Sequence, residues 1–258
     1  MIVRFDNLMS FADGQKGGNA SFQNAKVGDE REVGGMSENV VHNHEGFAAE
    51  ILAVSLPNGW ARTTITELGE VRLGRQRSPK NRSNNHPTKY IRAANLTWNG
   101  LDLSDVLDME FRPNELEIYR LHPGDILISE ASGSAKEVGK SAIWNDEIDD
   151  CCFQNTVIRF RSQVVSPKFA HLAFTHFARN GIFSRASKGV GIQHLSADRF
   201  SILPFLLPPA KEQVRIVEKV DELFSDLDAG VAALLRIRAK LKRYEVAPSL
   251  EYSGRIGL

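Results

Sequence analysis

A glycine-lysine-serine run is the first segment of this chain whose residue types could do chemistry. Residues 133–141 (Gly-Ser-Ala-Lys-Glu-Val-Gly-Lys-Ser) resemble a phosphate-binding loop, in which successive backbone amides surround a phosphate. That loop needs four residues between its glycines, and here there are five. The residues that follow, 142–145, are typical of a strand rather than of the helix whose N-terminus completes such an anion site. The sequence therefore favours a strand–loop–strand whose tip carries Lys136, with nucleotide hydrolysis as a third-ranked alternative.

Carboxylates and histidines are the other candidate catalytic groups. Asp125 and Glu130 could serve a metal-dependent nuclease, but such a site wants two carboxylates and a lysine, and Glu130 is followed by alanine and serine. Asp125 comes directly after a glycine and is predicted to lie in a turn. His171 and His176 are five residues apart on a predicted helix, so they point to different faces, unlike a ligand pair four apart. We therefore predict that the protein is not an enzyme and needs no metal or other cofactor.

Basic and acidic residues are separated along the chain, although the formal net charge is zero. Residues 71–101 and 151–197 hold 13 of the 32 Lys and Arg residues and none of the 32 Asp and Glu residues. Because phosphate repels carboxylates, this separation is expected of a surface that faces DNA. An ordinary solvated surface is the alternative.

Two polar loops in these stretches carry side chains that can read bases. Arginine can bind guanine through two hydrogen bonds, and asparagine or glutamine can bind adenine in the same way. Glycines in the second loop allow the backbone to approach DNA closely. The predicted DNA-binding residues are Arg75, Gln76, Arg77, Lys80, Arg82, Asn84 and Asn85 in the first loop, Lys188, Gly189, Gln193 and His194 in the second, and Lys136.

The elements that must position these loops indicate an α+β domain with a mixed sheet. Residues 55–207 alternate short strand-like runs with turns, and strands are expected at 89–93, 125–129, 140–144 and 156–161. A helix is expected at 167–180, where Ser166 is a suitable cap and Gly181 a suitable end. Strands and helices do not alternate regularly, which argues against repeated βαβ units. Residues 1–54, rich in Gly, Asn, Glu and Ser, are expected to form a poorly ordered leader with a short helix near 47–54.

Cysteine use and hydropathy predict the cellular compartment. Cys151 and Cys152 are neighbours, and a disulfide between neighbours is strained, so a reducing cytoplasm is the simpler interpretation. No run of 18 or more apolar residues is present, which predicts that the protein does not enter a membrane.

A long heptad helix is predicted at residues 208–247, followed by a short tail at 248–258. Pro208 and Pro209 preset the backbone for a first helical turn, and no further proline occurs before Pro248. One helix of about 35 residues, on the order of 50 Å long, can therefore form. A rod of that length should pack against another helix. Its predicted partner interface is Val217, Val220, Phe224, Leu227, Val231, Leu234 and Leu241.

The charges of this helix are also divided along its length. Acidic residues lie in its first half and basic residues in its second, which favours antiparallel pairing with a second copy of the chain. Complementation of the helix dipole within one helix predicts the same division. The residues are Asp221, Glu222, Asp226 and Asp228, then Arg236, Arg238, Lys240, Lys242 and Arg243.

Several short segments together resemble the specificity (S) subunit of type I restriction-modification systems. The strongest is 207–217 (Leu-Pro-Pro-Ala-Lys-Glu-Gln-Val-Arg-Ile-Val). The others are 56–60 (Leu-Pro-Asn-Gly-Trp), 90–95 (Tyr-Ile-Arg-Ala-Ala-Asn), 121–129 (Leu-His-Pro-Gly-Asp-Ile-Leu-Ile-Ser) and 138–142 (Val-Gly-Lys-Ser-Ala). The resemblance covers about residues 56–247. It implies a target recognition domain at 55–207 followed by a helical spacer.

The same resemblance implies function and partners. Specificity subunits bind double-stranded DNA, have no catalysis of their own, and direct adenine methylation, and restriction, by partner subunits. Their spacer helices pair antiparallel and bind methyltransferase (M) subunits, and restriction (R) subunits join through these. Typical members carry two recognition domains and two spacers, whereas this chain shows one of each. It is thus predicted to be a half-length form that pairs with itself, as symmetry at a palindromic bipartite site allows, or a truncated cassette. The competing hypothesis is a protein-binding helical scaffold without DNA readout.

Overall fold

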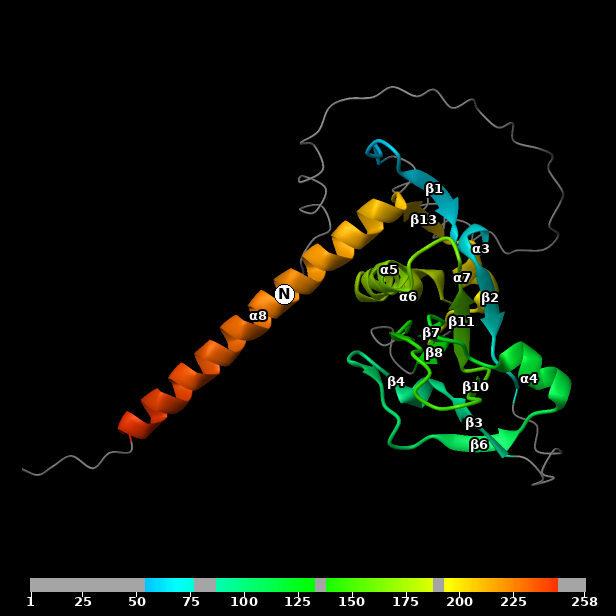
Figure 1. Ribbon diagram of the computed structural model, residues 1–258, viewed down its shortest axis with the longest axis horizontal. Helices are drawn as coiled ribbons and strands as arrows, with labels where there is room; N and C mark the ends of the chain where they lie inside the picture. The colour runs from blue at the N-terminus through cyan, green and yellow to red at the C-terminus, as the bar shows by residue number, and fades with distance from the viewer. Residues whose placement is uncertain (1–53, 77–86, 133–137, 188–192, 246–258) are drawn as a thin grey trace, which may run out of the picture. The chain divides into compact units, whose positions relative to one another are not determined.

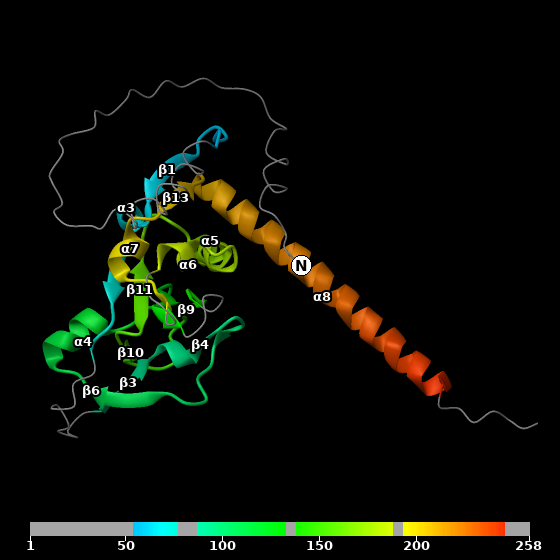
Figure 2. The same ribbon diagram turned by 180° about the vertical axis from the view of Figure 1, so that it is seen from behind.

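The structure is a computed structural model that describes residues 54–76, 87–132, 138–187 and 193–245. It divides into two units, Met1–Pro209 and Ala210–Leu258, which are called here the globular unit and the helical unit. Figures 1 and 2 show the elements of each. The predicted leader, apart from Val54, and the predicted tail lie outside the described residues.

A four-stranded antiparallel sheet is the centre of the globular unit, in the order β2-β11-β7-β9. Its strands are β2 (Glu70–Leu73), β11 (Val157–Arg161), β7 (Ile126–Ser129) and β9 (Ser141–Ile143). The two middle strands consist mainly of Val, Ile, Leu and Phe, which suit a pleated surface that is covered on both faces. All four residues of β7 are accordingly buried.

A second sheet mixes parallel and antiparallel pairs. Its order is β10-β3-β6, from β10 (Cys152–Phe153), β3 (Pro87–Ile91) and β6 (Leu107–Glu110). The pair β10–β3 is parallel and the pair β3–β6 is antiparallel. Three two-stranded ribbons complete the strands: β1 (Ala61–Thr64) with β13 (Pro204–Leu207), β4 (Leu96–Thr97) with β5 (Gly100–Leu101), and β8 (Ala131–Ser132) with β12 (Gln193–His194). In both views β1 and β13 lie at one end of the globular unit, and β3 and β6 lie at the opposite end (Figures 1 and 2).

The helices are mostly short. In chain order they are α3 (Ile65–Leu68), the 3-10 turn η2 (Ala93–Asn95), α4 (Pro113–Tyr119), α5 (Pro167–Arg179), α6 (Ile182–Ala186), α7 (Ala197–Ser201) and α8 (Ala210–Glu245). Helix α5 begins at a proline, whose missing amide needs no partner in the first turn. It ends just before Gly181, which adopts a left-handed conformation with φ +72°.

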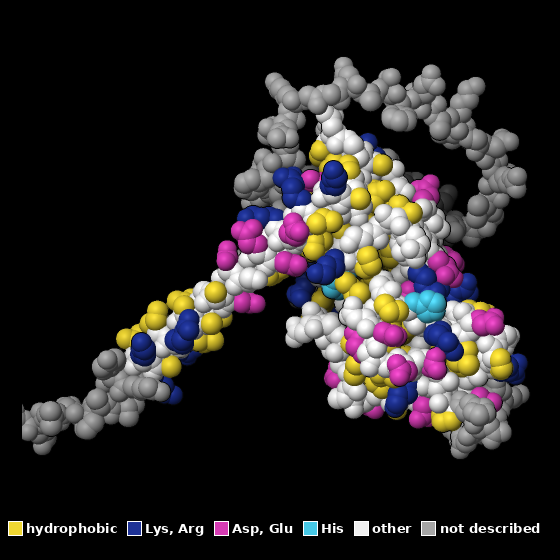
Figure 3. Space-filling model, viewed as in Figure 1, with side chains coloured by type: hydrophobic (Ala, Val, Ile, Leu, Met, Phe, Trp, Pro, Cys, Tyr) yellow, Lys and Arg dark blue, Asp and Glu magenta, His cyan; other side chains and the backbone are white. Residues whose placement is uncertain are grey.

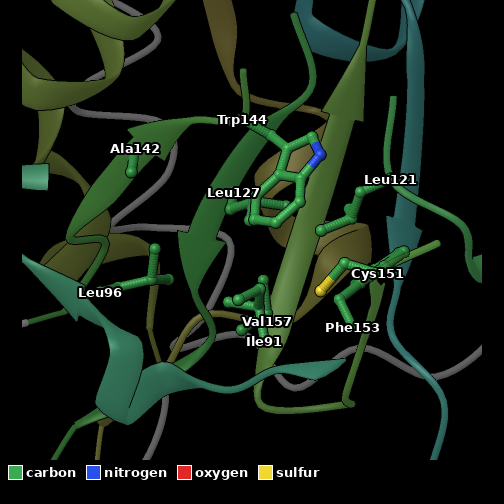
Figure 4. Close-up of a cluster of buried hydrophobic side chains, with 9 residues drawn as sticks. All are labelled: Ile91, Leu96, Leu121, Leu127, Ala142, Trp144, Cys151, Phe153 and Val157. Atoms are coloured by element: carbon green, nitrogen blue, oxygen red, sulfur yellow. The ribbon is translucent and has the colours of Figure 1, made fainter. Parts of the chain in front are cut away.

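Hydrophobic side chains fill both faces of the central sheet because alternate strand residues point in opposite directions. On one face Phe160 of β11 packs edge-on against Phe174 of α5, with ring centroids 5.3 Å apart, and Phe200 lies 5.0 Å from Phe174. On the other face Leu127 and Val157 join the cluster drawn in Figure 4. That cluster is Ile91, Leu96, Leu121, Leu127, Ala142, Trp144, Cys151, Phe153 and Val157.

The described structure confirms the predicted α+β class with a mixed sheet and a long C-terminal helix. Strands were expected at 125–129, 140–144 and 156–161 and are found as β7, β9 and β11. The expected strand at 89–93 is β3, which begins and ends two residues earlier. Helix α8 runs for 36 residues from Ala210. Among the described residues, no helix combines the length and apolarity that crossing a membrane requires.

The two cysteines are free and buried. Burial raises the pKa of Cys151 to about 12 and that of Cys152 to about 12. Both thiols therefore stay protonated and act as small core side chains.

Candidate nucleic-acid interface

The short ribbon β8–β12 joins two of the predicted DNA-binding segments. Ser132 pairs with Gln193 and Ala131 pairs with His194, in antiparallel register. The amide of Leu195 extends the ribbon by donating to the Glu130 carbonyl over 2.8 Å. Residues 133–137 leave from Ser132 and residues 188–192 return to Gln193, so two segments that are far apart in sequence have adjacent ends. Lys136, Lys188 and Gly189 themselves lie outside the described residues.

The opposite ends of these two segments also meet, at Phe183 of α6. A Cβ atom on Gly139 would lie 2.1 Å from Cδ2 of Phe183, and Gly139 has φ +80°, so only glycine fits this position. The Ser187 hydroxyl donates to the Phe183 carbonyl over 2.7 Å. We call Ser132, Gly139, Phe183, Ser187 and Gln193 the loop base. The loop base holds both predicted segments at both of their ends.

His194 belongs to the same ribbon and lies next to an acid. Its side chain is 52% exposed, and Nδ1 lies 3.6 Å from Oε2 of Glu130. The contact is an ion pair only when the imidazole is protonated. About half of the His194 side chain is thus exposed, at the end of the ribbon.

Arg75 departs from the exposed loop that the sequence predicted. Its side chain is buried, its Nε lies 2.9 Å from Oε1 of Glu115, and its guanidinium lies over the ring of Phe111 at 5.2 Å. Its amide donates to the Phe153 carbonyl over 3.1 Å, and its carbonyl accepts from the Asn155 amide over 3.0 Å. These contacts tie the end of β2 to β10 and α4. The geometry therefore favours a structural role for Arg75 over base readout.

Burial acts to raise the pKa of Glu115. The hydrogen bond from Arg75, together with the Arg112 amide, outweighs that effect and holds the pKa of Glu115 below its ordinary value. Glu115 is therefore ionised, and the buried Arg75 charge has its counter-charge.

The first predicted loop, which follows Arg75, is attached to a different part of the globular unit from the second. Gln76 is exposed at the end of the described segment, and the chain resumes at Pro87, which begins β3 in the second sheet. The other predicted members, Arg77, Lys80, Arg82, Asn84 and Asn85, lie outside the described residues. The anchors of the two predicted loops thus belong to different sheets.

Several described arginines of the acid-free stretches are paired with acids that lie outside those stretches. Arg72 and Arg159 both bind Glu70 at 2.5 Å, and Arg92 binds Asp105. On the face of the globular unit seen in Figure 3, basic and acidic side chains are interspersed. An acid-free stretch of sequence is therefore not an acid-free surface at these positions, because folding brings in carboxylates from outside the stretch.

Arg159 is the most buried of these arginines, with 1% of its side chain exposed. Burial is the main reason that its pKa lies below the ordinary value. Glu70 also experiences burial, but its hydrogen bond from Arg72 and the charge of Arg159 hold its pKa below the ordinary value. The pair stays charged, and it joins β11 to the beginning of β2.

Asp125, considered above as a nuclease carboxylate, is committed to a turn and an ion pair. It is 1% exposed and accepts from Arg161 Nε at 2.6 Å and Nη2 at 2.7 Å, and from the His122 amide at 2.8 Å. The hydrogen bond from Asp125 raises the pKa of Arg161. This pair borders an open cavity of about 420 Å³ that extends to the beginning of α5. Within the described ranges, no three His, Cys, Asp or Glu side chains are grouped as metal ligands would be.

The glycine-lysine-serine run enters a strand, as the sequence predicted. Ser141 begins β9, and its carbonyl lies 3.0 Å from Nε2 of His171 on α5. Burial lowers the pKa of His171, which therefore stays neutral near pH 7. No helix N-terminus follows this run to complete a phosphate site among the residues that the structure describes.

A stacked pair that sequence reasoning missed lies near the loop base. The guanidinium of Arg179, the last residue of α5, lies 4.2 Å from the ring centre of Trp98, in the turn between β4 and β5. Both strands of that hairpin contact β9, and α5 contacts β9 as well. Both residues lie in the acid-free stretches, and this was the one sequence feature that could have indicated them as contact residues. A tryptophan in a strand-rich region, however, suggests a residue of the hydrophobic core.

The helical unit carries the predicted partner interface as an apolar stripe. Residues 217, 220, 224, 227 and 231 follow the alternating steps that place side chains on one side of a helix. Phe224 is 60% exposed and Leu234 is 68% exposed, and Figure 3 shows hydrophobic side chains gathered along the helix towards its C-terminus. Large apolar side chains at such exposure are typical of surfaces on which another chain can pack.

Comparisons with known proteins complete these observations. Residues 57–235 match the family model described as "Type I restriction modification DNA specificity domain". The chain is 32% identical over 199 residues to the type I restriction enzyme StySPI specificity subunit of Salmonella potsdam, over 74% of this chain and 42% of that protein. It is 30% identical over 202 residues to the EcoKI specificity subunit of Escherichia coli (strain K12), over 76% of this chain and 42% of that protein.

Solved structures show the same fold. The HsdS subunit from Thermoanaerobacter tengcongensis superposes with a TM-score of 0.56 at 18% identity, over 81% of this chain and 49% of that one. A chain from a study of complex assembly and conformational transition of the type I R-M system gives the same TM-score at 17% identity. The chain thus spans less than half the length of the curated relatives that it matches.

Proposed function

Because the chain belongs to the type I restriction-modification DNA specificity family, we propose that it is the DNA-recognition component of a type I restriction-modification complex. The observation that carries the proposal is the extent of the family match, which runs from residue 57 through the rest of the globular unit and most of α8 to residue 235. In this function the globular unit binds double-stranded DNA. Methyltransferase subunits then modify adenine, and restriction subunits, which join through them, cleave DNA. Both reactions take place in the cytoplasm.

The segments held by the loop base are the proposed DNA contacts. Lys136, Lys188, Gly189, Gln193 and His194 lie in or next to them. Support comes from the paired ends of the two segments, since a contact surface must be positioned by rigid elements. Gln76, Arg77, Lys80, Arg82, Asn84 and Asn85 are a second proposed contact region, anchored between β2 and β3.

Helix α8 is the proposed assembly element. Its exposed stripe, Phe224, Leu227, Val231, Leu234 and Leu241, suits helix-on-helix packing with a methyltransferase subunit or with α8 of a second copy. In an antiparallel pair of copies, the acidic first half of each helix would lie against the basic second half of the other. That arrangement would place two recognition units about a two-fold axis.

A test of DNA recognition is a titration of the full chain, alone and with methyltransferase subunits, against duplex DNA. We expect affinity to fall steeply between 50 and 200 mM salt, by roughly 10³ or more if six or more phosphates are contacted. Lys136→Ala and Lys188→Ala should each lower the salt slope by about 0.9. The exposed Arg112, which lies beside Glu115, provides the control Arg112→Ala. Affinity that does not respond to salt would contradict the proposal.

The protein-binding scaffold is the second candidate, because the intramolecular pairing of Arg72, Arg75, Arg92 and Arg159 reduces the charge available to DNA. Methylome sequencing of cells with and without the chain separates the two. A bipartite adenine motif that disappears with the chain supports DNA recognition. An unchanged methylome, with intact methyltransferase subunits, supports the scaffold.

A further inference from the structure

The turn between β4 and β5 presents a tryptophan at a position where turns usually carry small polar residues. Thr97 and Gly100 pair across the ribbon, and Trp98 and Asn99 form the turn between them. The Thr97 hydroxyl donates to the Gly100 carbonyl over 2.9 Å and accepts from the Asn99 amide over 3.1 Å. These bonds constrain the backbone of the turn that carries Trp98.

Arg179 lies over this ring, and no described carboxylate is paired with it. Its guanidinium carbon is 4.2 Å from the Trp98 ring centre, and its side chain is otherwise exposed. Among the described residues no carboxylate forms an ion pair with Arg179, in contrast to Arg72, Arg75, Arg92, Arg159 and Arg161. Its positive charge is therefore not neutralised within the described structure. Among the described residues no hydrogen bond from the Arg179 guanidinium is found, so its N–H groups stay available to a ligand while its Cζ lies over the ring.

Capping of α5 does not account for Arg179. The carbonyl of Asn180, the C-cap residue of α5, already accepts from Arg185 Nη1 over 3.2 Å. The Arg179 guanidinium instead lies on the ring of a separate element, the β4–β5 hairpin. A cation that is held in this way is preorganised for a ligand that accepts hydrogen bonds.

The pair and the loop base are linked through strand β9. Strand β9 begins at Ser141, two residues after Gly139, and both the β4–β5 hairpin and α5 contact β9. The stack thus belongs to the same part of the globular unit as the segments that Gly139 and Phe183 hold.

We propose that the Trp98–Arg179 stack is a DNA contact, in which Trp98 orients Arg179 to donate to paired acceptors on the duplex. This inference rests on the proposed function, because it requires that the globular unit binds DNA. Two sources offer paired acceptors: the oxygens of a backbone phosphate, and O6 with N7 of guanine in the major groove. Arg179 is the contacting residue, and Trp98 is a positioning residue.

The first experiment measures the full chain against a pool of mixed-sequence duplexes by fluorescence anisotropy at 50–200 mM salt. If Arg179 binds a phosphate, Arg179→Ala should weaken binding roughly 5- to 10-fold at 0.1 M salt and lower the salt slope by about 0.9. Arg179→Lys keeps the charge and should restore the slope. Trp98→Ala should weaken binding about 2- to 5-fold with the slope unchanged, and Trp98→Phe, which keeps a ring, should recover most of that loss.

The second experiment tests the guanine source by selection from randomised duplexes. If Arg179 reads guanine, Arg179→Ala should select a site that has lost its preference for guanine at one position, with the other positions unchanged. Arg112→Ala, an exposed arginine next to Glu115 on α4, is the matched control and should behave as the unaltered chain in both experiments.

The outcomes separate the two proposals. If the unaltered chain binds duplexes and Arg179→Ala equals it in affinity, salt slope and selected sequence, this inference fails and the proposed function stands. If the unaltered chain, with or without methyltransferase subunits, binds no duplex, both fail. Thermal unfolding of each variant guards against a folding defect: a stack that only fastens the hairpin to α5 would lower stability and leave the DNA measurements of the folded protein unchanged.

Discussion

At the residue scale, the described arginines differ in whether a carboxylate is paired with them, as for Arg75 and Arg159, or not, as for Arg179. Arg75 is buried against Phe111 and paired with Glu115. Removing one partner of a buried ion pair leaves the other charge uncompensated. We expect Arg75→Ala to lower the free energy of unfolding by about 3 kcal/mol in urea denaturation, whereas the exposed Lys89→Ala stays within about 0.5 kcal/mol. An Arg75→Ala variant of normal stability with weakened DNA binding would restore Arg75 to the base-reading loop.

The burial of His171 predicts that the free energy of unfolding depends on pH. Burial lowers its folded-state pKa below the ordinary value of 6.5, so the unfolded chain binds this proton more readily than the folded one. Its contribution to stability is therefore complete above about pH 6.5 and is lost as the pH falls towards the folded-state pKa. Urea denaturation between pH 7.5 and 5 should show a declining free energy of unfolding, and His171→Gln, which can still donate to the Ser141 carbonyl, should show a shallower decline. Equal slopes in the two proteins would contradict this assignment.

The sequence could predict which types of side chain the proposed DNA-binding surface carries, but not which carboxylates its arginines pair with. Gln76 and Arg77 make Arg75 look like part of a polar loop, while its partner Glu115 lies 40 residues further along the chain. No local pattern encodes such a pair. Trp98 was missed for a related reason: a tryptophan among strands predicts core, and its contact with Arg179 depends on the placement of α5.

At the element scale, helix α8 is the feature that the sequence predicted most completely. Its apolar stripe lies on one side, and Leu227 on that stripe is 45% exposed. An aspartate there would bury a charge against any helix that packs on the stripe. We expect Leu227→Asp to weaken binding to methyltransferase subunits, or self-association, by at least about 100-fold in sedimentation velocity, with the thermal unfolding of the globular unit unchanged.

The matched control for that variant is Ala229→Asp. Residue 229 lies two positions further along the helix, about 200° around it, on the side away from the stripe. It introduces the same charge on the same exposed helix. Equal assembly of both variants with partners would show that the stripe is not the docking surface.

The success of prediction differs between elements for physical reasons. Helices α5 and α8 have proline at or just before their beginnings and an apolar period sustained over 13 and 36 residues. Helices α6 and α7 have five residues each, too few for a period to be recognised. The ribbon β8–β12 joins residues some 60 positions apart in two-residue strands, so its pairing, and with it the loop base, could be found only from the structure.

At the scale of the whole molecule, the two units have different sources of stability. The globular unit buries two cores against its central sheet, whereas α8 exposes most of its apolar side chains. A helix of this kind depends on a partner for much of its stability, since packing contributes more than helix propensity. Stability of α8 should therefore depend on protein concentration if copies pair through it.

The positions of the tryptophans allow the two units to be followed separately. All three, Trp60, Trp98 and Trp144, lie in the globular unit, so fluorescence reports that unit, while circular dichroism at 222 nm is strongly weighted towards the 36 residues of α8. On raising the concentration from about 1 to 100 μM, we expect the dichroism midpoint to rise by several degrees and the fluorescence midpoint to stay constant. Leu227→Asp should remove the concentration dependence of the first without altering the second. If the dichroism and fluorescence transitions coincide at every concentration, the two units unfold as one cooperative body. The globular unit and α8 would then not be independent in stability, even if one binds DNA and the other binds partner subunits.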